Sequence, residues 1–290
     1  MKKTKLFNLT MAIALACLSF SASAQIDTPA PSPAGSVSAR VGLTDIEVNY
    51  FRPQMKGRKI FGSGDGFLLQ SGTLWRAGAN SGTKVKFSDA VKVGGKDLAA
   101  GEYLLLATPG DTWSVVFYSD VSLGGNMGGY DASKAAAIVS VTPTKLTETV
   151  STLTYNITDL SEDGTGASLQ LAWENTSVKV PITVSFDEKV MAAIEAGTKI
   201  NVGNYVAAAN YYLNTGKDLN QALEWMNLYL AEGENSGQFW HVHTKARIQA
   251  ALGDKKGAKE TAKKSIELAK NFEQGDFGYI QRNEDFIKSL

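Results

Sequence analysis

A basic segment is the part of this sequence whose residue types and spacing are best suited to binding an acidic ligand. Arg52, Lys56, Arg58 and Lys59 lie within eight residues of one another, with no acidic residue among them. A guanidinium group binds a carboxylate or a sulfate through two parallel hydrogen bonds, and lysine adds a point charge. The segment therefore predicts a surface that attracts an acidic small molecule or a glycan.

A second motif, further along the sequence, contains Trp75, Arg76 and Asn80. Glycine and alanine between these residues would let a partner approach the backbone closely, and the indole offers an aromatic face. If both segments lie at one end of a domain, they form a binding site of seven residues: Arg52, Lys56, Arg58, Lys59, Trp75, Arg76 and Asn80. The alternative is that Trp75 belongs to the core and the cations form a solvated face.

Sequence motifs for catalysis are absent. There is no Gly-x-Ser-x-Gly, no His-Glu-x-x-His and no Gly-x-x-x-x-Gly-Lys. The two histidines, His241 and His243, point apart if they lie on a helix, so we expect no shared metal ion. Asp159, Glu162 and Asp163 crowd a turn, which we interpret as a solvated hairpin tip and not as a calcium site. We predict no catalytic residue, no metal and no cofactor.

The elements that carry the two motifs have the periodicity of strands. Residues 46–50 alternate between apolar and polar side chains, and Pro53 ends that strand because it has no N–H to donate. Residues 91–98 form two short alternating runs around Gly94-Gly95, which predicts a hairpin. About ten such segments, interrupted by one short helix near residues 131–136, predict an all-β antiparallel sandwich over residues 37–186.

From residue 187 the apolar period changes to that of helices. Aspartates that can cap helix N-termini and glycines that can end helices divide this region into about six segments. Ala209 to Gly216 and Ala246 to Gly253 have the same spacing, and they are 37 residues apart. This offset resembles tetratricopeptide-type hairpins, whose period is about 34. We predict an α-helical (TPR-like hairpin) domain over residues 187–290 that binds an unknown protein partner.

Several segments of the β region also resemble a known family. They are residues 43–62, 74–80, 91–98, 100–103, 113–117 and 171–175. Together they are similar to the secreted domain-of-unknown-function family numbered twenty-nine-eleven, over about residues 36–184. The resemblance implies export and a β-rich domain, and it supplies no activity and no catalytic residue. This sequence departs from the family pattern in the glycine-rich loop 62–72.

The N-terminal residues have the pattern of a targeting segment. Residues 1–24 contain three lysines, then an apolar stretch, then small residues at the cleavage positions, so we predict a signal peptide and cleavage before Gln25. Cys17 leaves a lipoprotein as the alternative, although Ala14 stands where a lipobox prefers a bulky aliphatic residue. Residues 25–36, rich in Pro, Ala and Ser, predict a linker. The expected location is periplasmic or secreted.

The composition of the mature protein argues against nucleic-acid binding and against a membrane span. Removal of residues 1–24 leaves 26 basic against 29 acidic residues, which argues against a nucleic-acid binder. No remaining apolar stretch reaches the roughly 18 residues of a membrane span. No cysteine remains either, so the core and not disulfides must stabilise the fold.

These observations favour an exported, non-enzymatic binding or assembly protein of the cell envelope. Its ligand would bind at the basic and aromatic loops, and its helical tail would bind a protein. The alternative is a hydrolase acting on a cell-envelope or carbohydrate substrate, with acids that sequence spacing does not identify. Two carboxylates that face each other across a deep cleft would favour the hydrolase, whereas a shallow basic or aromatic face would favour binding.

Overall fold

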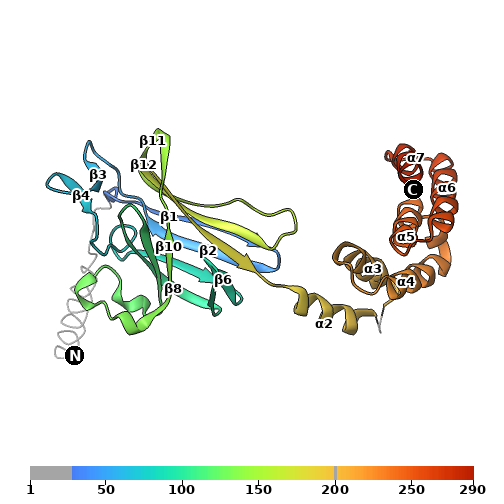
Figure 1. Cartoon of the computed structure of the whole chain (residues 1–290), viewed down its shortest axis with the longest axis horizontal. Coiled ribbons are helices and arrows are strands. Elements are labelled where there is room, and N and C mark those ends of the chain that lie inside the picture. Colours follow the sequence, from blue (N-terminus) through green and yellow to red (C-terminus); the bar gives the residue numbers. More distant parts are fainter. Residues whose placement is uncertain (1–27, 199–200) are drawn as a thin grey trace, which may run out of the picture. The chain divides into compact units, whose positions relative to one another are not determined.

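The structure is a computed structural model that describes residues 28–198 and 201–290. It divides into two compact units, Met1–Ser185 and Phe186–Leu290. The first contains antiparallel β-sheets and the second contains paired α-helices, which confirms the predicted fold class (Figure 1). The predicted signal peptide, with Cys17, lies outside the described residues. None of the described helices has the length and apolar character of a membrane span.

A six-stranded antiparallel sheet with the strand order β1-β2-β5-β8-β9-β10 forms one layer of the β unit. In β2, Ile46, Val48 and Tyr50 are buried and the residues between them are exposed, as their alternation predicts. Leu43 precedes the strand and is 44% exposed. The strands are β1 Ala34–Val41, β2 Thr44–Phe51, β5 Thr83–Phe87, β8 Gly101–Thr108, β9 Trp113–Tyr118 and β10 Ala135–Val141.

A four-stranded sheet with the order β11-β12-β6-β7 forms the second layer, and a short parallel pair, β3 and β4, lies apart from both sheets. The Tyr50 ring of one sheet meets the Tyr155 ring of the other edge-on, with 4.9 Å between ring centres. The strands are β3 Lys59–Gly62, β4 Phe67–Gln70, β6 Val91–Val93, β7 Lys96–Leu98, β11 Thr144–Thr158 and β12 Gly166–Val184. The hairpin predicted over residues 91–98 is β6 and β7.

Three sequence predictions differ from the structure in the β unit. The predicted linker 25–36 is three residues too long, because Ala34–Ser36 pair with β2 as the start of β1. Pairing with β2, the next strand along the chain, has overridden the local Pro and Ala composition. The helix predicted near residues 131–136 is a 3₁₀ helix of three residues, Ala132–Lys134. The region 168–186, in which the sequence predicts two strands, is the single strand β12; its pairing with β11 is irregular around Glu174, where φ is 55°.

The helical unit contains six α-helices among the described residues. The side chain of Asp218 accepts hydrogen bonds from the N–H groups of Asn220 and Gln221, which makes it the predicted N-cap of α4. Gly216 ends α3 in the left-handed conformation. The helices are α2 Asp187–Thr198, α3 Asn204–Thr215, α4 Leu219–Ala231, α5 Phe239–Ala251, α6 Lys255–Lys270 and α7 Tyr279–Ser289.

Small buried residues let neighbouring helices of this unit approach closely. Ala209 of α3, Ala222 and Met226 of α4 and Ile248 of α5 form one core cluster. Alanine presents little side-chain volume, so helix backbones can pack near one another. Helix pairing therefore agrees with the sequence prediction, whereas the tetratricopeptide assignment itself stays a prediction.

Candidate functional site

Two side chains of the predicted basic segment, Arg58 and Lys59, contact residues close to them in the sequence. The Arg58 guanidinium donates to the carbonyl oxygens of Met55 and Gln54, at 2.9 and 2.7 Å. The Lys59 Nζ lies 5.7 Å from the centre of the Phe67 ring. The Arg58 contacts stabilise the loop that leaves β2, and the Lys59 contact joins β3 to β4, so these two side chains have a local structural role.

The Trp75 motif is part of the core. Trp75 is 7% exposed, its indole N–H donates to the Gly78 carbonyl at 3.0 Å, and its ring stacks on Trp173 with 6.1 Å between ring centres. The Ala77 carbonyl accepts a 2.7 Å hydrogen bond from the Tyr155 hydroxyl, and burial raises the pKa of this phenol. Of the two interpretations of Trp75, the structure therefore favours the core residue.

The other predicted residues of the site are Arg52, Lys56, Arg76 and Asn80. Arg52 places its Nη2 3.5 Å from the Thr154 hydroxyl, and Lys56 and Asn80 are at least partly exposed. The Nε atoms of Arg52 and Arg76 are buried and have no hydrogen-bond partner within the described residues. Over those same residues, no hydrogen bond, ion pair or ring contact links the basic segment to Arg76 or Asn80.

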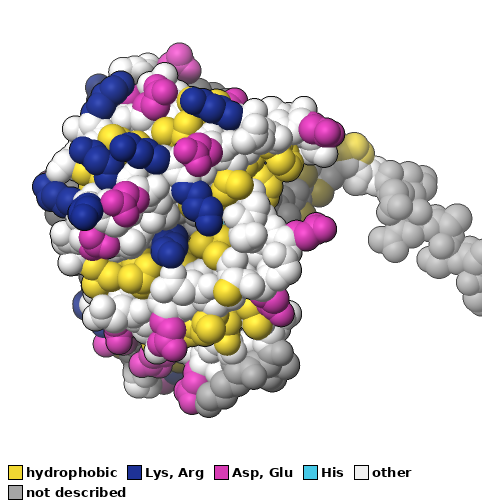
Figure 2. Space-filling view, turned by 90° about the vertical axis from the view of Figure 1, so that its right-hand side faces the viewer, with side chains coloured by type: hydrophobic (Ala, Val, Ile, Leu, Met, Phe, Trp, Pro, Cys, Tyr) yellow, Lys and Arg dark blue, Asp and Glu magenta, His cyan; other side chains and the backbone are white. Residues whose placement is uncertain are grey.

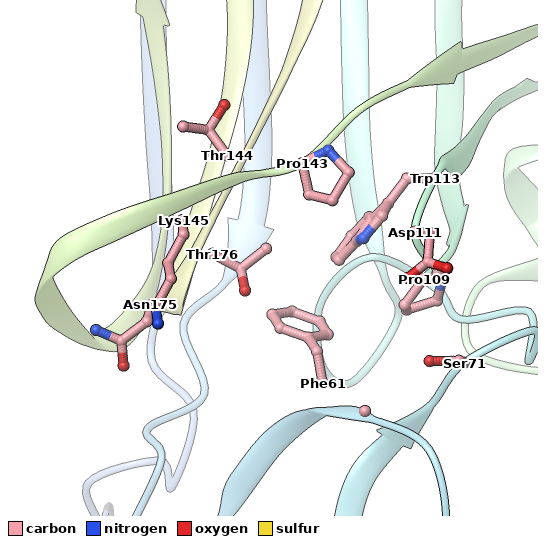
Figure 3. Close-up of a pocket in the computed structure, with 12 residues that line it drawn as sticks. Phe61, Ser71, Pro109, Asp111, Trp113, Pro143, Thr144, Lys145, Asn175 and Thr176 are labelled. Carbon is pink, nitrogen blue, oxygen red and sulfur yellow. The ribbon is translucent and has the colours of Figure 1, made fainter.

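A different pocket of the β unit combines aromatic and polar groups. It has a volume of about 370 Å³. Figure 3 shows Phe61 and Trp113 in the middle of the view, between two groups of lining residues. One group is Pro143, Thr144, Lys145, Asn175 and Thr176, and the other is Ser71, Pro109 and Asp111.

Phe61 and Trp113, which line this pocket, belong to a cluster of four aromatic rings. Phe61 is half-buried, and its ring meets Trp113 edge-on with 4.8 Å between ring centres. The Trp75 and Trp173 rings lie 6.0 Å from it, each also edge-on. Trp113 is 2% exposed, so Phe61 is the ring that a ligand reaches first. Packing on three sides holds that ring in one orientation.

Glu174 fixes the strand that carries Phe61. Its carboxylate oxygens lie 3.3 Å from the Ile60 backbone N–H nitrogen and 3.5 Å from that of Phe61. These contacts attach β3 to β12, far away in the sequence. Glu174 therefore positions Phe61, and its own backbone has a left-handed φ of 55°.

The rim of the pocket is polar and carries one group of each charge. Asp111, on the β8–β9 turn, and Lys145, on β11, are both exposed. The Asn175 amide nitrogen lies 3.2 Å from the Thr149 hydroxyl, which orients the amide. Asp111 is the one carboxylate among the described residues that line this pocket. An apolar floor with a few placed polar groups is typical of a small-molecule binding site.

Comparison with known proteins identifies the family of the β unit. Residues 32–182 match the family described as "Protein of unknown function (DUF2911)". The chain belongs to the DUF2911 family. This confirms the resemblance seen in the sequence, and the whole Phe61–Trp113 pocket lies within the matched residues. No curated protein and no solved structure matches it.

The sequence alone does not indicate that the pocket residues of the DUF2911 domain form a site. Phe61, Trp113 and Asn175 all lie in segments that carry the family resemblance, and none of them is charged or part of a catalytic motif. Their position in one pocket depends on contacts between residues more than fifty positions apart. The signal that the sequence does offer is weaker: aromatic residues and turn prolines that adjoin strand ends.

The two histidines of this DUF2911 protein lie in the helical unit and have different neighbours. The His241 ring packs on Tyr229 at 5.2 Å, and the His243 ring packs on Tyr279 at 5.7 Å, between ring centres. Both border one cavity, which their spacing on a helix does not predict. The described residues contain no group of three or more His, Cys, Asp or Glu that could hold a metal ion.

Proposed function

We propose that this protein is an exported, non-enzymatic binding protein of the cell envelope that holds an oligosaccharide at the Phe61–Trp113 pocket. The observation that supports this most strongly is the half-buried Phe61 ring, backed by three tryptophans and surrounded by polar groups. An aromatic face attracts the C–H groups of a sugar ring, and the pocket volume of about 370 Å³ is in the range of ligand sites.

The hydrogen-bonding groups of the rim suit sugar hydroxyls. Hydroxyl and amide side chains both donate and accept, as sugar hydroxyls do. The side-chain hydroxyls of Ser71, Thr144 and Thr176 make no hydrogen bond to other described residues, so they are available to a ligand. Lys145 adds a cation that can bind an acidic substituent of a glycan.

Export and protein binding complete the proposal. The charge and apolar pattern of residues 1–24 supports transport to the periplasm or the exterior. The helical unit supports the binding of a protein partner, because Leu228 and Phe277 are large apolar residues that are 48% and 63% exposed. A protein with both features would connect an envelope glycan to a second protein.

A hydrolase of envelope carbohydrate is the second candidate, and Asp111 is the observation that favours it. Glycoside hydrolysis usually needs two carboxylates, an acid and a base or nucleophile. In the described lining Asp111 has no such partner, and the nearby Glu174 carboxylate faces backbone N–H groups. We therefore place binding ahead of hydrolysis.

Calorimetric titration of residues 25–290 with neutral and acidic oligosaccharides tests the proposal. We expect one class to bind, and we expect Asn175→Ala to weaken that binding about 10-fold, which corresponds to one lost hydrogen bond of about 1.4 kcal/mol. Asn156→Ala is the matched control, because Asn156 is an exposed asparagine of β11 outside the pocket.

Two results of this titration would contradict the proposal. One is that no oligosaccharide binds, and the other is that the Asn175 and Asn156 variants bind equally well. Mass spectrometry of the same mixtures detects cleavage. Shortened oligosaccharides would show that the protein is a hydrolase and that the binding proposal is wrong.

A further inference from the structure

The helical unit contains a second cavity, of about 500 Å³, bordered by α3, α5 and α7. Arg247 of α5 and Arg282 of α7 contribute to its lining, together with His241 and His243, and no carboxylate is among the described lining residues. On the face that Figure 2 shows, basic side chains lie beside acidic ones. The cavity is therefore a local concentration of positive charge.

A buried hydrogen-bond network fixes the two helices that carry the arginines. The Asn283 amide nitrogen donates to the Tyr279 carbonyl at 2.7 Å and to the Ser265 hydroxyl at 3.0 Å. Its oxygen is thereby left to accept from the Nδ1–H of His243, at 2.7 Å. Asn283 is fully buried, so this network joins α7 to α5 and α6. Arg282 immediately precedes Asn283, and its backbone position is set by the same contacts.

Both arginines have nitrogen atoms available to a ligand. The Arg282 guanidinium carbon lies 4.6 Å from the centre of the Tyr279 ring, and stacking on a ring face leaves the N–H edge open. Arg247 is exposed, and neither arginine has an ion-pair partner within the described residues. Burial lowers the pKa of His243, the Asn283 hydrogen bond opposes this, and the charges of Arg247 and Arg282 lower it further. Both guanidinium groups thus lie close to one imidazole.

We propose that this cavity binds carboxylate groups of an acidic segment of a partner protein, with Arg247 and Arg282 as the guanidinium donors. Each guanidinium can form two parallel hydrogen bonds with a carboxylate, and Trp240 in the lining offers an apolar wall to a neighbouring side chain. The inference rests on the proposed role of the helical unit in protein binding and gives that partner a chemistry. The carboxylates can come from Asp and Glu side chains or from the free C-terminus of the partner.

Fluorescence anisotropy with three labelled peptides, titrated with residues 25–290, tests this inference. The peptides are a glutamate-rich peptide with an amidated C-terminus, a peptide without acidic side chains that ends in a free carboxylate, and the amidated form of the second. We expect at least one of the first two to bind, less tightly as salt is added, and we expect the third not to bind. The peptide that binds identifies the source of the carboxylate.

Arginine variants test whether the cavity is the site that binds the peptide. Arg247→Ala and Arg282→Ala should each weaken peptide binding about 10-fold or more, the effect of one lost charged hydrogen bond. Arg282→Lys should also weaken it, because an ammonium group lacks the planar fork. Lys256→Ala is the control, since it removes an exposed cation of α6 outside the cavity. Far-UV circular dichroism verifies that each variant is folded.

Three results would overturn this inference: no peptide binds, the third peptide binds as well as the others, or the arginine variants bind as well as the Lys256 variant. Oligosaccharide titration of the same samples separates the two proposals. If a sugar binds and the acidic peptides do not, only the cavity assignment is wrong. If neither binds, the proposed function is wrong as well.

Discussion

Replacing Trp173 by alanine is expected to lower the free energy of unfolding of the β unit by about 3–5 kcal/mol. Trp173 is 1% exposed, and its ring centre lies 6.1 Å from that of Trp75 and 6.0 Å from that of Phe61. Truncation would leave a cavity beside both rings, because neighbouring side chains relax only in part. Urea denaturation followed by circular dichroism measures the change.

Trp173→Phe is the matched variant for this experiment. The Trp173 indole N–H is buried and has no hydrogen-bond partner within the described residues, and an unpaired buried donor costs about 1–3 kcal/mol. Phenylalanine removes this donor and keeps an aromatic ring, so we expect a loss below about 1.5 kcal/mol. If the phenylalanine variant were as unstable as the alanine variant, the cluster would not be stabilised by ring packing as described.

Replacing Glu174 by alanine is expected to destabilise the protein by about 1–3 kcal/mol and to weaken oligosaccharide binding. The substitution removes the acceptor for the backbone N–H groups of Ile60 and Phe61, and Ile60 is fully buried. Without this attachment β3 is held less firmly, and the Phe61 ring loses its fixed orientation. Hydrogen exchange at the Ile60 and Phe61 amides, together with urea denaturation, measures both effects.

Glu174→Gly separates the carboxylate from the backbone conformation. Glycine adopts the φ of 55° without strain, so it should be more stable than the alanine variant by about 1 kcal/mol. Both variants should nevertheless show faster exchange at Phe61, because both lack the carboxylate. Unchanged exchange at Phe61 in both variants would show that Glu174 does not position β3.

Much of the fold could be predicted because its signals are local. The alternation of apolar and polar residues in β5 indicates a strand, and the Gly94-Gly95 turn indicates a hairpin. Both signals lie within the element that they predict. The Asp218 cap and the left-handed Gly216 likewise mark helix ends within one turn. For residues 34–36, pairing with the neighbouring strand β2 overrides the Pro and Ala composition that predicts a linker.

The candidate site could not be predicted from the sequence, because it depends on contacts between residues far apart along the chain. The concentration of charge favours the basic segment as the binding site, whereas the Arg58 guanidinium donates hydrogen bonds to carbonyl groups of its own loop. The pocket depends on the contact of Phe61 with Trp113 and on the hydrogen bonds that Glu174 accepts from β3, and both join residues far apart along the chain. The sequence around Trp75 is compatible with a core residue and with a ligand-binding residue. The contacts of Trp75 with Phe61 and Trp173 distinguish the two.

The most direct test of the oligosaccharide site is an NMR titration that follows the indole N–H signals of all five tryptophans. A bound oligosaccharide should shift the signal of Trp113, which lines the pocket, and leave those of Trp225 and Trp240 in the helical unit unchanged. A panel of envelope oligosaccharides that leaves the Trp113 signal in place, or that shifts all five signals alike, would contradict the assignment of the Phe61–Trp113 pocket as a sugar-binding site.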